Sequence, residues 1–401
     1  MPKILITGNG FDLNENLPTK YSDFLSVINF IVSSHENNFD SIIKNIECYI
    51  YLAINYYTDD ITIDSKNLEK IKLLAKTNQL FLFFKDEFEI DTWIDFENRI
   101  EYLLKNIFEF CTIINKNIFE KSPIGKTTKY YNYLIFDNKI EIAEILTQFG
   151  FVHKHNTDTF SLNKNYLNEK FDFYTGINYK KIAEEITHLL DEFSELFNLY
   201  IQIFVIPLYN KRKEIPKNLF SHIDRHYTFN YTPTFNLFYG DSLRTSYLHG
   251  KSSLIDQNMV LGVDNIDLNI VREPAFLNFT KYYQKYSKRT DYYFLNELGK
   301  DDLNENFEFY FWGHSLNRSD ADYINEVFDF VTKLKQTIKR IIVVYHSDDS
   351  YKSLLLNLFS VRGKVDIENK IKNNVLVFLH CDSVDLKTSL HGSIAKPDIF
   401  F

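Results

Sequence analysis

Four short segments of the chain carry residue types that bind nucleotides or transfer protons, and each follows a stretch typical of a β-strand. They are Gly8-Asn9-Gly10, Asn230, His249-Gly250 and Gly313-His314-Ser315. Glycine lets a backbone turn sharply with its N–H groups uncovered, histidine exchanges protons near neutral pH, and asparagine offers both donors and an acceptor. Because ligands of open α/β sheets bind beyond the carboxyl ends of the strands, these segments together indicate a ligand site.

Each segment also has a purely structural interpretation. Asn230 could cap a turn, and His249 could be a buried histidine that donates to a carbonyl group. His314 with Ser315 could cap the loop before the next helix. The segment Gly8-Asn9-Gly10 could be a tight turn without a ligand, because the third glycine of the dinucleotide-binding fingerprint is absent.

The N-terminal element that positions the glycine turn is a predicted strand around Ile4 and Ile6, buried on both faces. A helix is expected to follow, with Thr19 as its N-cap. In this arrangement the backbone N–H groups from Gly8 to Phe11 would take a pyrophosphate. Asp12 could hydrogen-bond a ribose hydroxyl, or it could be a turn residue.

The C-terminal half supplies the other predicted strands, and the middle of the chain supplies helices. Strand-like runs lie at 225–232, 245–250, 259–264, 307–312, 340–345 and 374–380. A capping box at Ser319-Asp320-Ala321-Asp322 predicts a helix between two of them. An apolar stripe from Asn178 to the Pro207 region predicts a long helix in the middle.

This alternation predicts an α/β fold with a Rossmann-like parallel sheet. We expect the N-terminal strand and the C-terminal half to form that sheet, with a large, mainly helical insertion. The expected division is residues 1–30 plus 200–401 for the nucleotide-binding domain and residues 31–199 for the insertion.

Composition excludes several classes of protein. The 401-residue chain has a formal net charge of −9, which argues against broad nucleic-acid binding. Its short basic groups are Lys211-Arg212-Lys213 and 285–289. The three cysteines lie far apart without a CxxC pair, which predicts neither a disulfide framework nor a zinc site and fits a cytoplasmic protein. No window approaches the roughly 18 apolar residues of a membrane span, and no metal is expected.

The motifs taken together resemble the AbiH family of bacterial abortive-infection, or phage-defence, proteins. The resemblance covers both ends of the chain in order and rests on 6–13, 17–24, 93–97, 228–232, 248–250, 312–316 and Asp320. It implies an antiphage function. The helical middle contributes only the segment at 93–97.

A more distant resemblance is to the sirtuin-like domains of bacterial defence systems, which bind and often hydrolyse NAD. Gly8-Asn9-Gly10 stands in place of their Gly-Ala-Gly turn, and Asn230 and His249 match their catalytic Asn and His. Gly313-His314-Ser315 with Asp320 matches a Gly-x-Ser-x-x-Asp segment loosely. The four-cysteine zinc module of deacetylase sirtuins has no counterpart, so lysine deacetylation is not expected.

These resemblances imply an abortive-infection effector that binds and hydrolyses NAD or a related nucleotide, as a glycohydrolase-type hydrolase. His249 and Asn230 are the expected catalytic residues. The expected ligand-binding residues are Gly8, Asn9, Gly10, Phe11, Asp12, Gly250, Gly313, His314 and Ser315. The expected partners are the nucleotide, a phage-derived trigger or partner protein, and further copies of the chain in a homo-oligomer. The alternatives are a non-catalytic nucleotide sensor that gates a partner and a toxin that acts on nucleic acid.

Overall fold

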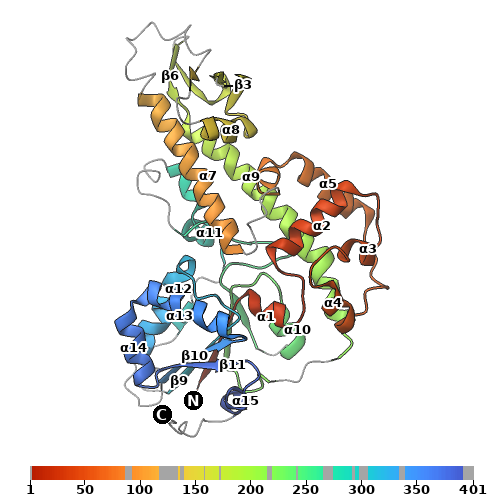
Figure 1. Cartoon of the computed structure of the whole chain (residues 1–401), viewed down its shortest axis with the longest axis vertical. Coiled ribbons are helices and arrows are strands. Elements are labelled where there is room, and N and C mark those ends of the chain that lie inside the picture. The colour runs from red at the N-terminus through yellow and green to blue at the C-terminus, as the bar shows by residue number, and fades with distance from the viewer. Residues whose placement is uncertain are drawn as a thin grey trace. The chain divides into compact units, whose positions relative to one another are not determined.

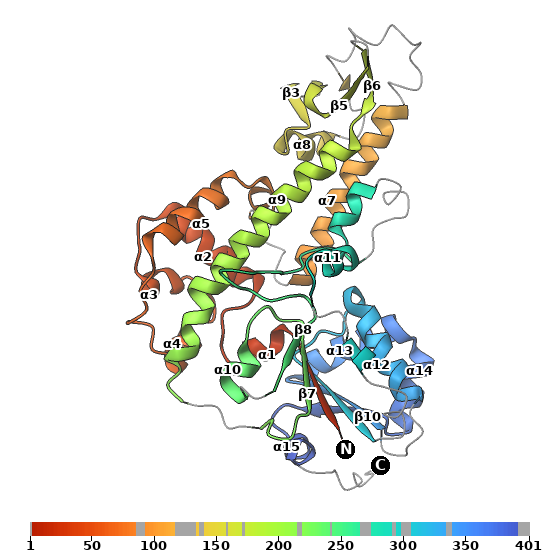
Figure 2. The same cartoon turned by 180° about the vertical axis from the view of Figure 1, so that it is seen from behind.

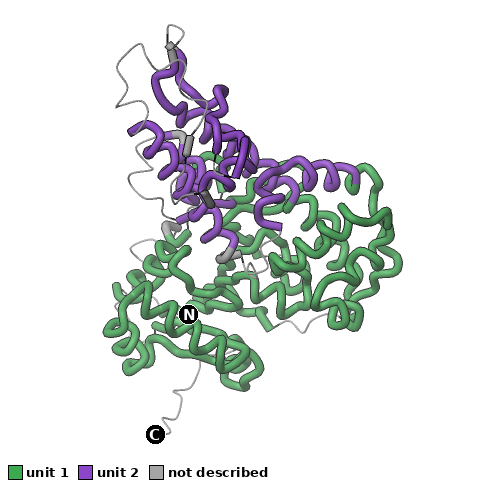
Figure 3. Tube along the Cα trace, turned by 45° about the horizontal axis from the view of Figure 1, so that its top comes forward, with its two compact units in different colours: residues 1–68, 197–260, 285–401 green, residues 69–196, 261–284 purple. Residues whose placement is uncertain are grey.

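The computed structural model describes residues 2–85, 93–116, 134–135, 140–157, 159–170, 173–214, 219–240, 243–264, 274–290, 294–297, 306–333 and 339–391. The chain divides into two compact units (Figure 3). Unit 1 contains residues 1–68, 197–260 and 285–401, and unit 2 contains residues 69–196 and 261–284. Residues 31–68, which the sequence assigned to the insertion, belong to unit 1, where Phe39 stacks on Phe204 with 5.7 Å between ring centroids.

Unit 1 is built on a six-stranded, all-parallel sheet in the order β11-β10-β9-β1-β7-β8 (Figures 1 and 2). Counted along the chain, these strands have the spatial order 3-2-1-4-5-6 of doubly wound dinucleotide-binding folds, read from the opposite edge. The predicted Rossmann-like α/β fold is therefore confirmed. The strands are β1 (Lys3–Thr7), β7 (Arg225–Thr228), β8 (Thr245–Tyr247), β9 (Phe307–Trp312), β10 (Lys339–Tyr345) and β11 (Leu376–His380).

Alternating side chains of the central strands fill two hydrophobic cores. Phe309 and Phe311 of β9 face one core with apolar residues of α12 (Ala321–Lys333), α13 (Asp348–Arg362) and α14 (Lys364–Lys372). Tyr310 and Trp312 face the other core with residues of α1 (Asn9–Asn14), α10 (Thr234–Tyr239) and α15 (Val384–His391). Burial on both faces explains why the central strands are almost purely apolar in sequence.

Two predicted helix starts lie slightly away from their expected positions. The cap of α2 (Tyr21–Ser33) is Lys20 rather than Thr19, because the Asp23 carboxylate accepts a hydrogen bond of 3.2 Å from the Lys20 amide. The helix predicted from the capping box at Ser319–Asp322 is present as α12. A 3₁₀ turn, η8 (Arg318–Asp320), precedes it, and the Asn317 side chain caps this turn by accepting from the Ser319 amide.

The predicted strand at 259–264 is not a strand. Val263 makes an isolated bridge to Thr280, and the Val260 amide instead donates to the carbonyl of His249 over 2.8 Å. The remaining helices of unit 1 are α3 (Phe39–Ile43), α4 (Tyr49–Asn55) and the start of α5 (Ser65–Thr77).

Unit 2 is largely helical, as predicted for the middle of the chain. It contains α6 (Gln79–Phe84), α7 (Trp93–Ile114), α8 (Ile140–Gln148), most of α9 (Tyr179–Tyr200) and the first half of α11 (Lys281–Ser287). The side chains of residues 93–95 lie outside the described part. A π-helical turn, η3 (Ile201–Val205), and a 3₁₀ helix, η4 (Ile206–Lys211), extend α9, which confirms the predicted helix from Asn178 to Pro207.

Unit 2 also contains two small antiparallel sheets that the sequence did not predict. One has the order β2 (Leu134–Ile135), β4 (Thr159–Leu162), β3 (Val152–Asn156), and the other pairs β5 (Leu167–Lys170) with β6 (Phe173–Ile177). Within the described ranges, none of the helices combines the length and the apolar content required to cross a bilayer.

Candidate functional site

The sequence-predicted site residues gather at the carboxyl ends of β1, β7, β8 and β9, all within unit 1. They form two groups rather than one. The first, which we call the imidazole cluster, comprises His249, His314 and Asp320. The second, the Asp12 cluster, comprises Asp12, Asn230 and Thr232. The two expected catalytic residues, His249 and Asn230, therefore belong to different clusters.

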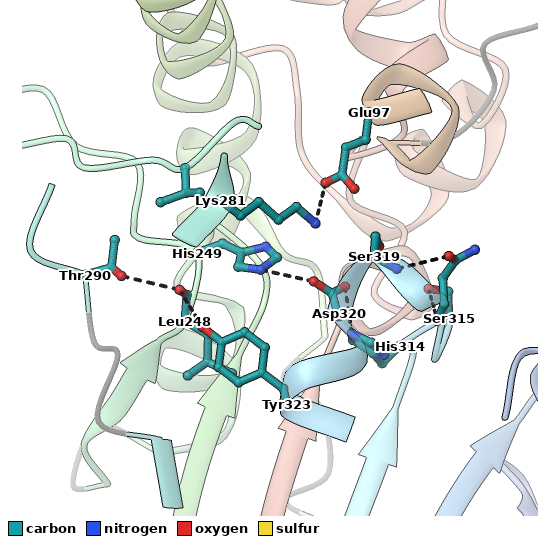
Figure 4. Close-up of polar contacts among 12 residues, drawn as sticks. Glu97, Leu248, His249, Lys281, Thr290, His314, Ser315, Ser319, Asp320 and Tyr323 are labelled. Atoms are coloured by element: carbon teal, nitrogen blue, oxygen red, sulfur yellow. Dashed lines mark hydrogen bonds and ion pairs between the residues drawn. The ribbon is translucent and has the colours of Figure 1, made fainter. Parts of the chain in front are cut away.

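The imidazole cluster places one carboxylate between two histidines (Figure 4). Nε2 of His249 lies 3.2 Å from Oδ1 of Asp320, and Nε2 of His314 lies 3.4 Å from Oδ2. The side chain of Asp320 is 11% exposed, whereas those of His249 and His314 are 7% and 3% exposed. The Phe229 ring packs on both imidazoles, with centroid separations of 5.0 Å to His249 and 4.2 Å to His314. The Asp320 carboxylate is thus nearly buried and lies within ion-pair distance of both imidazoles, which can accept protons.

A backbone contact determines which nitrogen of His314 carries the proton. Nδ1 of His314 accepts a hydrogen bond of 2.9 Å from the amide of Leu316. An acceptor nitrogen has no proton, so the neutral imidazole carries its proton on Nε2, the atom that faces Asp320. This tautomer also leaves Nε2 without the lone pair that a metal ligand needs.

His249 is held at the end of β8 by a loop that requires glycine. Gly250 has φ +78°, and a Cβ at this position would lie 2.1 Å from the carbonyl oxygen of Asn258. Two backbone segments therefore meet too closely for any side chain. The close packing of these two segments is by itself a sufficient reason for a glycine at position 250, whether or not Gly250 contacts a ligand.

The Asp12 cluster is more deeply buried, and its carboxylate accepts from neutral donors. Nδ2 of Asn230 donates to Oδ1 of Asp12 and to the carbonyl of Gly8, each over 3.0 Å, and the Thr232 hydroxyl donates to Oδ2 of Asp12. Both amide protons of Asn230 are engaged, so its Oδ1 is the group left to contact a ligand. The backbone amide of Asn230 donates to the Thr228 hydroxyl over 3.0 Å, which fixes the residue further.

Burial raises the pKa of Asp12 to about 6. The hydrogen bonds from Thr232, Thr234 and Asn230 oppose this rise, and the nearby Glu15 carboxylate adds to it. Because burial outweighs these hydrogen bonds, the Asp12 carboxyl loses its proton less readily than an exposed one. Its oxygens hold the neighbouring donors in place.

The glycine turn after β1 crosses the loop after β9 at backbone contact. A Cβ on Gly8 would lie 2.7 Å from Cα of His314, and one on Gly10 would lie 2.8 Å from Cα of Gly313. Gly313 itself has φ +66°, and a Cβ there would lie 2.1 Å from the amide nitrogen of Phe11. The three glycines thus permit two loops to pass at the point where the strand order reverses.

The amides of this turn already have acceptors. Gly8 donates to the Trp312 carbonyl over 3.1 Å, Gly10 to the Gly313 carbonyl over 2.8 Å, and Phe11 to the Gly8 carbonyl over 2.9 Å. A pyrophosphate that bound here would have to compete with these bonds.

Three other expected ligand residues make contacts within the fold. Asn9 donates its Nδ2 to the Thr19 carbonyl over 3.1 Å. The Phe11 ring is buried against Phe220, Tyr239 and Trp312. Oγ of Ser315 accepts from the Asn317 amide over 3.4 Å.

The basic segments considered for a nucleic-acid surface are engaged with neighbouring groups. Lys211 pairs with Asp60, Arg212 pairs with Glu15, and Lys213 donates to the carbonyl of Ala53. In the second segment, Nζ of Lys285 lies 4.1 Å from the ring centroid of Tyr323, and Lys288 donates to the carbonyl of Met259. Each of these five basic side chains therefore contacts a neighbouring group of the protein.

Among the described residues, one group meets the geometry of a metal site: His380, Cys381 and Asp382. Nδ1 of His380 accepts from the Asp382 amide over 3.2 Å, while its Nε2 lies 3.1 Å from the His346 carbonyl. Both imidazole nitrogens are therefore used by the backbone, and this group is a turn rather than a metal centre.

Sequence reasoning did not assign a site role to Asp320 or Thr232. His314 and Asp320 are only six residues apart in the sequence. The chain turns between them through the 3₁₀ turn η8, and this brings the two side chains together. Thr232 lies two residues after Asn230 in the run 225–232 that was predicted as a strand, and alternation along a strand would have placed both side chains on one side.

A comparison with protein families matches residues 4–345 to the family described as Bacteriophage abortive infection AbiH. Searches of curated proteins and of solved structures gave no match. The family match covers β1, both clusters and β10.

Proposed function

The chain belongs to the bacteriophage abortive infection AbiH family, which indicates an antiphage role, and we propose that in this role it binds and hydrolyses NAD or a related nucleotide. The observation that supports this most is the pairing of His249 with the Asp320 carboxylate, 3.2 Å apart, at the carboxyl edge of a sheet with dinucleotide-binding strand order. An oriented, nearly buried imidazole at such an edge suits general-base catalysis.

The proposed reaction cleaves the N-glycosidic bond between C1′ of the ribose and nicotinamide. Nicotinamide leaves with the bonding electron pair, and the oxygen of one water forms the new bond to C1′. His249 takes the proton that this water loses. Asn230, whose Oδ1 is its remaining acceptor, would receive a hydrogen bond from the water or from a ribose hydroxyl. ADP-ribose, nicotinamide and one proton are the products.

The two clusters supply a base and an orienting amide, so the substrate should carry a leaving group that departs without further help. The nicotinamide of NAD⁺ is a cationic substituent that departs as a neutral molecule. A site with one base and one orienting amide fits such a substrate better than it fits a phosphodiester.

The test is the cellular NAD concentration during phage infection, at equal protein levels. We expect NAD to collapse in cells with the wild-type protein and to stay level with His249→Ala or Asn230→Ala. His188→Ala, which changes a 68% exposed imidazole on α9, is the matched control and should behave as wild type. Melting temperatures of the variants establish that each is folded.

Steady NAD in wild-type cells, with protection that still depends on Gly8 and Gly10, would overturn the hydrolase and favour a nucleotide sensor. Steady NAD with protection indifferent to His249, Asn230 and both glycines would place the chemistry elsewhere in the molecule. A phage-derived trigger is expected to be required, so uninfected cells are the baseline.

A further inference from the structure

We propose that β11 is the surface through which two copies of the chain associate, by antiparallel pairing of one β11 with the other. β11 lies at one edge of the six-stranded sheet and, among the described strands, is hydrogen-bonded to β10 alone. The pairing would join the sheets of two copies into one continuous sheet. This inference concerns assembly and does not depend on the proposed hydrolysis.

Every second residue of β11 turns its backbone away from β10. The Cys381 amide, directly after the strand, donates to the Tyr345 carbonyl of β10 over 2.8 Å. Backbone groups point to alternate sides along a strand, so the residues that face outward are Leu376, Phe378 and His380. Within the part of the chain that the structure describes, the amides of these three residues have no acceptor. Such a row of backbone groups is a template for another strand.

The two edges of the sheet differ in the features that usually prevent such pairing. β8, at the opposite edge, has only three residues, each with a hydroxyl group. β11 has five residues, of which four are apolar, and it contains no lysine, proline or bulge. Native sheets normally protect an edge by short length or by features of this kind. β11 is therefore the edge that can accept another strand.

The charges at the two ends of β11 favour a second copy as that strand. Within five residues of the strand, Lys372 is the only charged side chain before it, and Asp382 and Asp385 are the charged side chains after it. All three residues are exposed, and Lys372 makes no ion pair among the described residues. Antiparallel pairing brings the basic end of each copy to the acidic end of the other, whereas parallel pairing places like charges together.

The middle residue of the strand determines the register. With a two-fold axis at Phe378, the amide and carbonyl of this residue bond to the same groups of the second copy. The His380 amide then bonds to the Leu376 carbonyl. The half-buried Phe378 side chains of the two copies lie opposite each other. The pairing ends at the His380 carbonyl, which already accepts from the Ser383 amide over 3.0 Å.

The first experiment measures the dimer dissociation constant by sedimentation equilibrium at low salt, where charge effects are largest. We expect the wild type to dimerise as its concentration rises. Lys372→Glu sets a carboxylate against Asp382 and Asp385 and should raise the dissociation constant at least about tenfold. Adding Asp382→Lys should lower it again by at least about threefold. Lys364→Glu makes the same charge change at a 70% exposed position of α14 and is the matched control, which should leave the constant unchanged.

The second experiment tests the backbone pairing. His380→Pro removes one outward amide, and an edge strand tolerates proline where the N–H faces outward. Because the two-fold axis doubles the loss, the dissociation constant should rise at least about tenfold. His380→Ala keeps the amide and is the matched control, which should dimerise as the wild type does. Hydrogen exchange of the Phe378 and His380 amides should slow as the wild-type concentration rises.

Three results would overturn the inference. The first is a wild-type chain that stays monomeric up to about 100 μM. The second is a dimer that neither Lys372→Glu nor His380→Pro weakens, because such a dimer uses another surface. The third is a variant ending at His391 that dimerises although the full chain does not, which would assign the edge to residues 392–401 of the same chain. Melting temperatures establish that each variant is folded. None of these measurements involves NAD, so a failure here is distinct from a failure of the proposed function.

Discussion

The imidazole cluster and the Asp12 cluster lie at neighbouring strand ends of one sheet, yet the side chains that surround the carboxylate differ between them. Asp320 is paired with two imidazoles, and its side chain is 11% exposed. Asp12 is 1% exposed and accepts hydrogen bonds from an amide and a hydroxyl, which are neutral donors. The first can exchange protons through its partners, and the second can only orient them.

This difference separates two tasks that the proposed hydrolysis needs. Proton transfer requires a group whose protonation changes during the reaction. Orientation requires groups that do not change, held by donors with no alternative partner. Substitutions in the two clusters should therefore have different signatures: loss of activity with little loss of stability in the imidazole cluster, and loss of both activity and stability in the Asp12 cluster.

Gly313→Ala should have the largest effect, because this glycine lies where the loops that carry both clusters cross. The new Cβ would lie 2.1 Å from the Phe11 amide nitrogen, at φ +66°. We expect a loss of about 3–5 kcal/mol in the free energy of unfolding, measured by urea denaturation.

Gly363→Ala is the matched control for that change. Gly363 has a similar φ of +83° and nothing within 4 Å of the position that a Cβ would take, so only backbone strain remains. With ψ +146° this backbone lies close to a region that only glycine populates readily, so the change should cost about 1–3 kcal/mol. Equal losses of unfolding free energy in Gly313→Ala and Gly363→Ala would show that the steric clash between the two loops adds nothing to the backbone strain.

Asp12 should make the fold less stable as the pH rises, unlike the usual surface carboxylate. Its pKa rises from 3.8 to about 6 on folding, so the stability that it contributes is complete below pH 3.8 and is lost as the pH rises through about 6. The total loss, from well below pH 3.8 to well above pH 6, is about 3 kcal/mol.

Asp12→Asn removes this titration, so the difference in unfolding free energy between wild type and variant isolates it. Denaturation at several pH values from about 4 to about 7 should show the wild type losing stability relative to the variant. Parallel pH curves for the two proteins would contradict the assignment of a raised pKa to Asp12.

Thr232→Val tests one donor of the Asp12 cluster. The valine keeps the shape of the side chain and leaves Oδ2 of Asp12 without the Thr232 hydroxyl. We expect a loss of about 1–2 kcal/mol at about pH 7, and a smaller loss near pH 4, where Asp12 is largely protonated. Thr332→Val, which removes a hydroxyl bonded within α12 to the Phe328 carbonyl, is the control and should be near neutral.

Tyr323→Phe should change least. The Tyr323 hydroxyl lies 3.5 Å from the Leu248 carbonyl, a long contact, whereas the ring packs on Phe229 with 5.2 Å between centroids. The ring is retained in the variant. The free energy of unfolding should shift by less than about 0.5 kcal/mol, and NAD loss should stay within about twofold of wild type. A large fall in activity would give the hydroxyl a role beside the imidazole cluster.

The sheet could be predicted from the sequence because each central strand is an apolar run that ends in polar or glycine residues. Runs such as Phe309-Tyr310-Phe311 are buried on both faces, so apolar and aromatic residues occupy consecutive positions instead of alternating with polar ones. The gathering of Asn230, His249 and His314 at one edge followed from the same argument.

The pairing within that edge could not be predicted, because it depends on tertiary detail. Whether His249 meets Asn230 or Asp320 is decided by a 3₁₀ turn and a glycine crossing, neither of which has a periodic signal. The cap of α2 was predicted at Thr19 and lies at Lys20, because several adjacent residues can cap a helix. The small sheets of unit 2 were missed because their strands are short and because β3 and β5 are largely polar.

The position of β1 in the middle of the sheet has a consequence for how the protein is made. Its neighbour β9 pairs Lys3 with Glu308, so about 300 residues must be synthesised before β1 gains this partner. At about 5–20 residues per second, this interval is roughly 15–60 s. Asp320 follows β9, so the imidazole cluster can form only after this strand has also been synthesised. A nascent chain that has not reached Asp320 therefore contains His249 without the carboxylate that lies 3.2 Å from its Nε2 in the folded protein.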